Sequence, residues 1–198
     1  SSCISPHIPN KIKKRYTFCF NDSIDVSNMK IQTNGFYEEL HIWWNNSGYG
    51  KTYKPKWDTI PIDIIFFNNG LCAYQFGWYK HTGKQYLDSI ARHPKRPEID
   101  AQFKGLYKII GDTIKLQLIN DRRWADPTWG ATEISYKILN KNTLLRIGKK
   151  PLDYDGSFIL AEKINNNTLK SKFIPIDSLP SDRIWLTNRK WFWCKHRK

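Results

Sequence analysis

Apolar and polar residues alternate with a period of two over most of the chain from about residue 34 onward, which predicts antiparallel β-sheet. In the clearest run, one face of a strand carries four apolar side chains, at Ile60, Ile62, Ile64 and Phe66. Turn sequences such as Asn69-Gly70 and Gly111-Asp112 separate the runs. Because glycine and asparagine tolerate the positive φ of tight hairpins, these positions predict short connections between neighbouring strands.

The pattern predicts about eight strands joined mostly by short turns, with one apolar face throughout. The expected strands are 36–44, 60–66, 72–78, 103–109, 114–118, 134–138, 144–147 and 158–163. A meander of this kind suits an all-β, antiparallel up-and-down barrel, because closure removes the open edges of a sheet. A sandwich of two sheets remains the alternative. Residues 86–92 are expected to form a turn or two of helix.

The chain of 198 residues is long enough for one domain with a substantial core. We expect residues 1–29 to form an N-terminal tether, 30–165 the barrel and 166–198 a C-terminal extension. The extension is irregular, but the segment 185–193 holds three tryptophans and a phenylalanine. Because so much aromatic surface is costly to expose, we expect the extension to pack on the barrel wall.

Several short motifs, in this order, resemble uncharacterised lipoproteins of Bacteroidetes, which are similar to lipocalin-like (calycin) β-barrels. The motifs are Thr33-Asn34-Gly35-Phe36-Tyr37, Phe66-Phe67-Asn68-Asn69-Gly70, the block 105–114 and the Trp-rich tail. The resemblance covers roughly residues 30–195 and implies a lipocalin-like barrel. Gly35-Phe36-Tyr37 stands where lipocalins carry Gly-x-Trp. The resemblance brings no catalytic residues with it.

The formal net charge is +14, from 32 Lys and Arg against 18 Asp and Glu. A positive field of this size attracts anionic surfaces, including nucleic acid and acidic lipid. Lysine outnumbers arginine by 23 to 9, whereas base recognition favours the bidentate arginine fork. These counts argue against nucleic-acid binding as the main role, and it is kept as an alternative. We interpret the basic runs 11–15 and 189–198 as solvated termini, with attachment to an anionic surface as the alternative.

Two small residues, Ser1-Ser2, precede Cys3. Small residues directly before a cysteine resemble the end of a bacterial lipoprotein signal peptide, in which that cysteine is lipidated. We therefore expect lipidation of Cys3, which would hold the protein on the inner or outer membrane of a bacterial cell envelope.

Three further cysteines follow, at Cys19, Cys72 and Cys194. Their odd number allows one disulfide and one free thiol, but the sequence does not fix which residues pair. Cys72 lies in an apolar strand and is expected to be buried as a small hydrophobic residue.

No sequence motif for catalysis is present. The chain has no Gly-x-Ser-x-Gly elbow, no zinc-hydrolase His spacing and no phosphate-binding loop. The densest acid-base group is Glu38, Glu39 and His41, for which we expect an exposed polar strand face. We therefore expect no enzymatic activity, no metal and no cofactor; an enzyme of unknown reaction remains the second alternative.

Aromatic residues are concentrated around the expected loop 45–59, and an arginine pair and two tryptophans occupy the segment 121–130. Such rings can line an apolar cavity, and nearby cations can bind an acidic head group. The sequence therefore predicts a non-catalytic domain that binds a small apolar or amphiphilic ligand or acts as an interaction module. The candidate ligand-binding residues are Trp43, Trp57, Tyr74, Trp78, Arg122, Arg123, Trp124 and Trp129.

Overall fold

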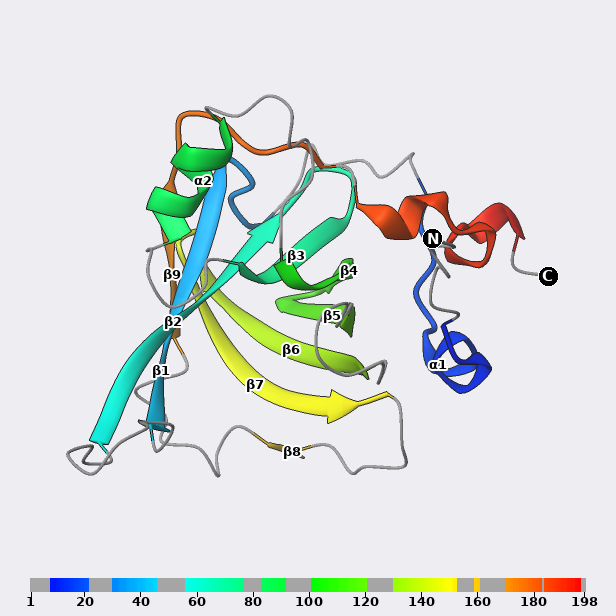
Figure 1. Cartoon of the computed structure of the whole chain (residues 1–198), viewed down its shortest axis with the longest axis horizontal. Helices are drawn as coiled ribbons and strands as arrows, with labels where there is room; N and C mark the ends of the chain where they lie inside the picture. Colours follow the sequence, from blue (N-terminus) through cyan, green and yellow to red (C-terminus); the bar gives the residue numbers. More distant parts are fainter. Residues whose placement is uncertain are drawn as a thin grey trace, which may run out of the picture.

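The protein forms a closed antiparallel barrel of eight strands, as the alternation predicts, in a computed structural model (Figure 1). The structure describes residues 8–21, 30–45, 56–76, 83–91, 101–120, 130–152, 159–160, 170–182 and 184–196. The barrel strands are β1 (Gly35–Asn45), β2 (Lys56–Phe66), β3 (Leu71–Phe76), β4 (Ala101–Ile110), β5 (Thr113–Asn120), β6 (Gly130–Asn140), β7 (Thr143–Pro151) and β9 (Lys170–Pro175).

Each strand from β1 to β7 pairs with the next along the chain, and β9 closes the barrel between β7 and β1. This closure excludes the open two-sheet sandwich. A short strand, β8 (Ile159–Leu160), adds only two residue pairs to β7. The eighth barrel strand is therefore β9, which lies beyond the segment 158–163 and beyond the expected barrel boundary at residue 165.

Three tight hairpins form where the turn sequences predict them. Gly70 and Gly111 have φ values of 84° and 63°, a region that side chains disfavour. The Asn69 side chain accepts a hydrogen bond from the Leu71 amide at 3.1 Å. The Asn140 side chain accepts one from the amide of Asn142 at 2.9 Å. These local bonds fix the register of the strands that the turns connect.

Two separate hydrophobic clusters lie on the two faces of the barrel wall. The lumen cluster fills the interior; its buried members are Ile31, Tyr37, Ile64, Phe66, Cys72, Tyr74, Tyr107, Ile114, Leu116, Leu118, Ile134, Tyr136 and Leu144. The outer cluster joins outward residues of the strands to α1 (Asn10–Arg15), to α2 (Gly83–Ala91) and to the C-terminal segment. Cys72 is a free, buried thiol within the lumen cluster, as its apolar strand predicts.

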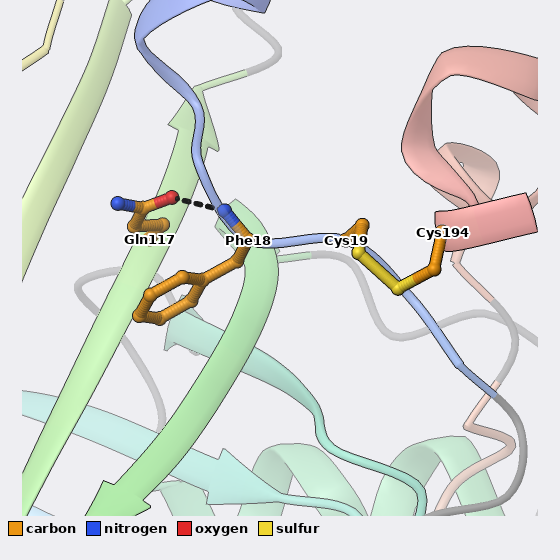
Figure 2. Close-up of a disulfide and its surroundings, with 4 residues drawn as sticks. All are labelled: Phe18, Cys19, Gln117 and Cys194. Carbon is orange, nitrogen blue, oxygen red and sulfur yellow. Dashed lines mark hydrogen bonds between the residues drawn. A yellow bond between two sulfur atoms is a disulfide. The ribbon is translucent and has the colours of Figure 1, made fainter. Parts of the chain in front are cut away.

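The two ends of the chain pack together on the outer wall. The C-terminal segment consists of three 3-10 turns, η3 (Trp185–Asn188), η4 (Lys190–Phe192) and η5 (Cys194–His196), and lies beside α1 (Figure 1). The Phe20 amide donates a hydrogen bond to the carbonyl of Phe192 at 2.7 Å. A disulfide between Cys19 and Cys194 links the two segments covalently (Figure 2). The expected packing of the C-terminal segment on the barrel is confirmed.

The N-terminal segment is held on the barrel by a side chain of β5. Gln117 points outward, and its Oε1 accepts hydrogen bonds from the amides of Thr17 and Phe18, each at 2.9 Å. Figure 2 shows the bond from Phe18. The Tyr16 hydroxyl donates to the Gln117 carbonyl at 2.8 Å. Residues 8–20, which the sequence places in a tether, are thus packed on the barrel, with Ile12 fully buried.

Candidate functional site

The hairpin end of the barrel, where the three tight turns lie, is crossed by residues 30–33. Ile31 is buried in the lumen cluster. The Gln32 amide donates to the Tyr37 hydroxyl at 2.9 Å, and that hydroxyl donates to the carbonyl of Lys141 at 2.6 Å. Burial raises the pKa of Tyr37 to about 12, so the hydroxyl stays protonated as a donor. A ligand would therefore have to enter from the opposite end.

Large side chains fill the lumen near the hairpin end. The ring of Phe66 lies 5.6 Å from the ring of Tyr37 and 4.9 Å from that of Tyr107, both in edge-to-face geometry. The Tyr107 hydroxyl donates to the Phe67 carbonyl at 2.8 Å. An eight-stranded barrel leaves little interior space once such side chains are inside. This half of the lumen is a packed core.

A polar cluster occupies the lumen farther from the hairpin end. A guanidinium nitrogen of Arg146 on β7 lies 3.2 Å from a carboxylate oxygen of Glu39 on β1, and the two side chains are 7% and 0% exposed. The Ser171 hydroxyl on β9 donates to the other Glu39 oxygen at 3.2 Å. Tyr74 on β3 and Tyr136 on β6 complete the group, which we call the lumen polar cluster. It draws side chains from five strands to one place.

The charges of the lumen polar cluster stabilise one another. Burial alone would lower the pKa of Arg146, but the nearby Glu39 carboxylate raises it, so Arg146 stays cationic. Burial, and then the negative charge of Glu39, raise the pKa of both Tyr74 and Tyr136 above the usual value. Both phenols are therefore neutral donors at physiological pH.

Two buried polar atoms on the lumen wall have no hydrogen-bond partner within the part of the chain that the structure describes. They are the hydroxyl of Tyr136 and the amide oxygen of Asn120. The Tyr136 hydroxyl lies close to the Glu39 carboxylate and the Tyr74 hydroxyl, and a weak hydrogen bond to Glu39 contributes to its raised pKa, but no contact of this hydroxyl reaches full hydrogen-bond geometry. Buried groups of this kind are rare, and an additional bound molecule commonly satisfies them.

A second cation faces the same lumen. The β6–β7 register shifts between Ser135 and Tyr136. On one side of the shift Tyr136 pairs with Arg146, and on the other side Ile134, a lumen residue, pairs with Lys149. Partial burial, and then the charge of Arg146, lower the pKa of Lys149. Its side chain still reaches solvent. Lys149 thus adds a second cation to the lumen beside the Arg146–Glu39 pair.

The predicted ligand-binding residues are only partly placed. Tyr74 lies in the lumen, with its ring 5.8 Å from that of Phe103. Trp43 and Trp57 belong to β1 and β2 near the end opposite the hairpins, where the backbones of the two strands pair. The remaining candidates lie outside the described residues: Trp78, Arg122, Arg123, Trp124, Trp129 and the lipidation candidate Cys3.

The prediction for Glu39 was wrong. We expected an exposed polar face, but Glu39 is fully buried in the lumen because Arg146, a residue distant in sequence, neutralises it there. Arg146, Tyr136 and Ser171 were not singled out from the sequence. A signal was present, since Glu39 shares a strand face with Tyr37, and Arg146 shares one with Leu144. Two opposite charges on apolar faces predict a buried pair.

Comparison of the chain with protein-family models, with curated proteins and with solved structures found no match. Among the described residues, no group of three or more His, Cys, Asp or Glu side chains is close enough to hold a metal ion. No helix in the described ranges has the length and apolar character needed to cross a membrane.

Proposed function

We propose that this chain is a non-catalytic ligand-binding domain of a bacterial cell-envelope lipoprotein. In this proposal the lumen holds a small amphiphilic molecule with an acidic head group, and the relationship to lipocalin-like barrels stays part of the same proposal. The observation that carries it is the lumen polar cluster, with its buried Arg146–Glu39 pair and the unsatisfied Tyr136 hydroxyl.

The polar groups of the lumen support an acidic head group. A buried donor without a well-formed hydrogen bond costs up to about 1–3 kcal/mol, part of which a ligand oxygen on Tyr136 would recover. Arg146 and Lys149 together exceed the charge of Glu39, so these three neighbouring side chains carry a net positive charge. An anionic oxygen near Tyr136 would satisfy both the phenol and the excess cation.

Apolar groups beside the cluster support an aliphatic body for the ligand. Ile62 is the cross-strand partner of Glu39, and Phe103 is the partner of both Tyr74 and Asn120. Both apolar side chains are only partly buried, although they pack against the lumen cluster. A hydrocarbon chain against them would be removed from water at about 25 cal/mol per Å² of apolar surface.

The cysteines support the envelope assignment. Disulfides persist in oxidising compartments and are rare in the cytosol. Cys19 and Cys194 are paired, and Cys72 is buried as a free thiol, so no partner for Cys3 remains among them. This leaves Cys3 for lipidation. The test is the intact mass of the protein from its native host. A mass above that of the polypeptide by a diacylglyceryl group, absent in Cys3→Ala, supports the lipid anchor. A mass equal to that of the polypeptide alone overturns it.

Ligand binding is tested with cis-parinaric acid, a fluorescent fatty acid, and its methyl ester as a neutral control. We expect the acid to bind more tightly than the ester. Tyr136→Phe removes a hydroxyl whose contacts fall short of full hydrogen-bond geometry, so the variant should fold normally. Its affinity for the acid should be roughly tenfold lower. Lys149→Gln should lower it roughly fivefold, because its charge is partly screened.

The matched control is Lys150→Gln, one residue along β7, where the side chain is exposed and lies opposite outward Glu133. This variant should bind the acid like the wild type. Absence of binding, or an affinity that neither Tyr136→Phe nor Lys149→Gln changes, would overturn the lumen as a binding site.

A further inference from the structure

A group of lysines lies on the outer wall of the barrel toward the hairpin end. Their strand neighbours face the lumen, so the lysine side chains point outward. Lys108 and Lys115 are direct cross-strand partners, and Lys137 and Lys170 both pair with Leu145. These lysines surround the hairpin end halfway round the barrel, from β4 to β9, and we call this surface the lysine face; its members are Lys108, Lys115, Lys137, Lys170 and Lys172 on the strands and Lys30 and Lys141 beside the turns.

The lysine face is poor in compensating charge. Its neighbouring carboxylates are Glu38, opposite Lys172 in the β1–β9 register, Glu133, diagonal to Lys115 in the β5–β6 register, and Asp112 in a turn. No carboxylate among the described residues forms an ion pair with the strand lysines of this face, while Lys108 lies 4.9 Å from the ring centre of Phe18. Like charges directly opposite one another destabilise a sheet. An external anion would remove this repulsion.

Two exposed aliphatic side chains stand at the tips of the hairpins beside these lysines. Ile110, at the end of β4, is 58% exposed, and Leu139, near the end of β6, is 43% exposed. The two hairpins are neighbours, because the Ile138 amide donates to the Asp112 carbonyl at 2.7 Å. The hairpin end therefore presents two apolar tips with lysines around them.

We propose that the lysine face and its apolar tips dock this domain on a lipid bilayer that carries anionic head groups. Ile110 and Leu139 enter the boundary between head groups and acyl chains, and the lysines lie at the level of the anionic phosphates. Aliphatic side chains beside amines on long stems suit this boundary, where apolar burial adds to electrostatic attraction.

A nucleic acid fits the same surface less well. Single-stranded nucleic acid is bound by stacking its bases on aromatic rings, whereas the tips are isoleucine and leucine. Base-edge recognition in a duplex relies most often on arginine, and all seven cations of the lysine face are lysines. The docking surface lies on the outer wall, so it does not depend on the ligand proposed for the lumen.

The experiment is flotation of the full chain, prepared without lipid on Cys3, with vesicles of phosphatidylcholine alone or with 30% phosphatidylglycerol. We expect binding to the anionic vesicles only. The double variant Lys115→Gln with Lys137→Gln should lower the vesicle partition coefficient roughly 25-fold, because each lysine near the membrane surface contributes a factor of about five. The matched control is Lys14→Gln with Lys190→Gln, which removes the same charge from exposed positions on α1 and η4 and should change it less than twofold.

The apolar tips are tested separately. Ile110→Ser with Leu139→Ser should reduce vesicle binding most visibly in 0.5 M salt, where the electrostatic attraction is screened. Leu40→Ser is the control, because Leu40 is 48% exposed on β1, away from both tips. The proposal is overturned if no anionic vesicle binds, if the control variants lose as much binding, or if the lysine variants weaken binding to duplex DNA while vesicle binding is unchanged.

Discussion

The buried Arg146–Glu39 pair yields a quantitative prediction for Arg146→Met. The variant keeps most of the side-chain volume but leaves the Glu39 carboxylate, 0% exposed, without the guanidinium that lies 3.2 Å away. Removing one partner of a buried ion pair costs about 3–5 kcal/mol. That is a large part of a typical stability of about 5–15 kcal/mol, and it corresponds to a fall of about 10 °C in Tm.

The double variant Glu39→Leu with Arg146→Met isolates the coupling between the two charges. Apolar replacements of similar volume avoid the cost of burying ions, so its stability should lie within about 1 kcal/mol of the wild type or above it. The assay is urea unfolding of the disulfide-intact protein, followed by tryptophan fluorescence and far-UV circular dichroism. The two single variants complete the double-mutant cycle.

Two results would refute the reasoning. A cost below about 1 kcal/mol for Arg146→Met would mean that water screens the pair as it does at a surface. If the double variant has as low a free energy of unfolding as either single variant, the charged groups themselves stabilise the barrel. Ser171→Ala calibrates the scale, since it removes one hydrogen bond to Glu39 and should cost about 1 kcal/mol.

Three further predictions test other parts of the fold. Burial, and then the charge of Glu38, raise the pKa of Asp63 to about 8, so Asp63 weakens the fold as pH rises from about 4 to 8. Asp63→Asn should therefore add about 5 kcal/mol at pH 8, at about 1.4 kcal/mol per pKa unit, and almost nothing at pH 4, measured by urea unfolding at both pH values. Replacing Cys19 and Cys194 by serine should cost up to about 5 kcal/mol, read as a lower Tm, because the disulfide closes a separation of 175 residues; an unchanged Tm would contradict it. Gly105→Ala should cost at least ~3 kcal/mol in urea unfolding, because the new methyl group would overlap the Gln117 carbonyl; a loss below ~1 kcal/mol would show that β5 can move away.

The sequence was sufficient for the barrel and most of its hairpins, because alternation and turn residues are local properties. It was misleading at the last strand. The segment 158–163 begins with four apolar residues, whereas Lys170–Pro175 begins with three polar ones, yet the latter closes the barrel as β9. Half of β9 is polar, because Lys170 and Lys172 face outward and Ser171 bonds to Glu39. The alternation of apolar and polar residues is weak in a strand whose inward side chains are polar.

The candidate site depended on long-range contacts that the sequence could not supply. The environment of Glu39 is determined by Arg146, and the hydroxyl of Ser171 comes from a third strand. The same limitation applied to the cysteines, whose spacing left the pairing open until the N- and C-terminal segments were found side by side. Tyr74, one of the candidate ligand-binding residues, lies in the lumen because the side chains of β3 alternate between the outer and the lumen cluster.

The Cys19–Cys194 disulfide has a mechanical consequence. The barrel strands all lie between these two residues, so they form a closed covalent loop. A tensile force applied outside the loop, at one end of the chain against the other, is transmitted from Cys19 to Cys194 through the sulfur–sulfur bond. The strands between them carry almost none of that load. A domain held at one end and pulled at the other would therefore keep its barrel folded until the disulfide is reduced.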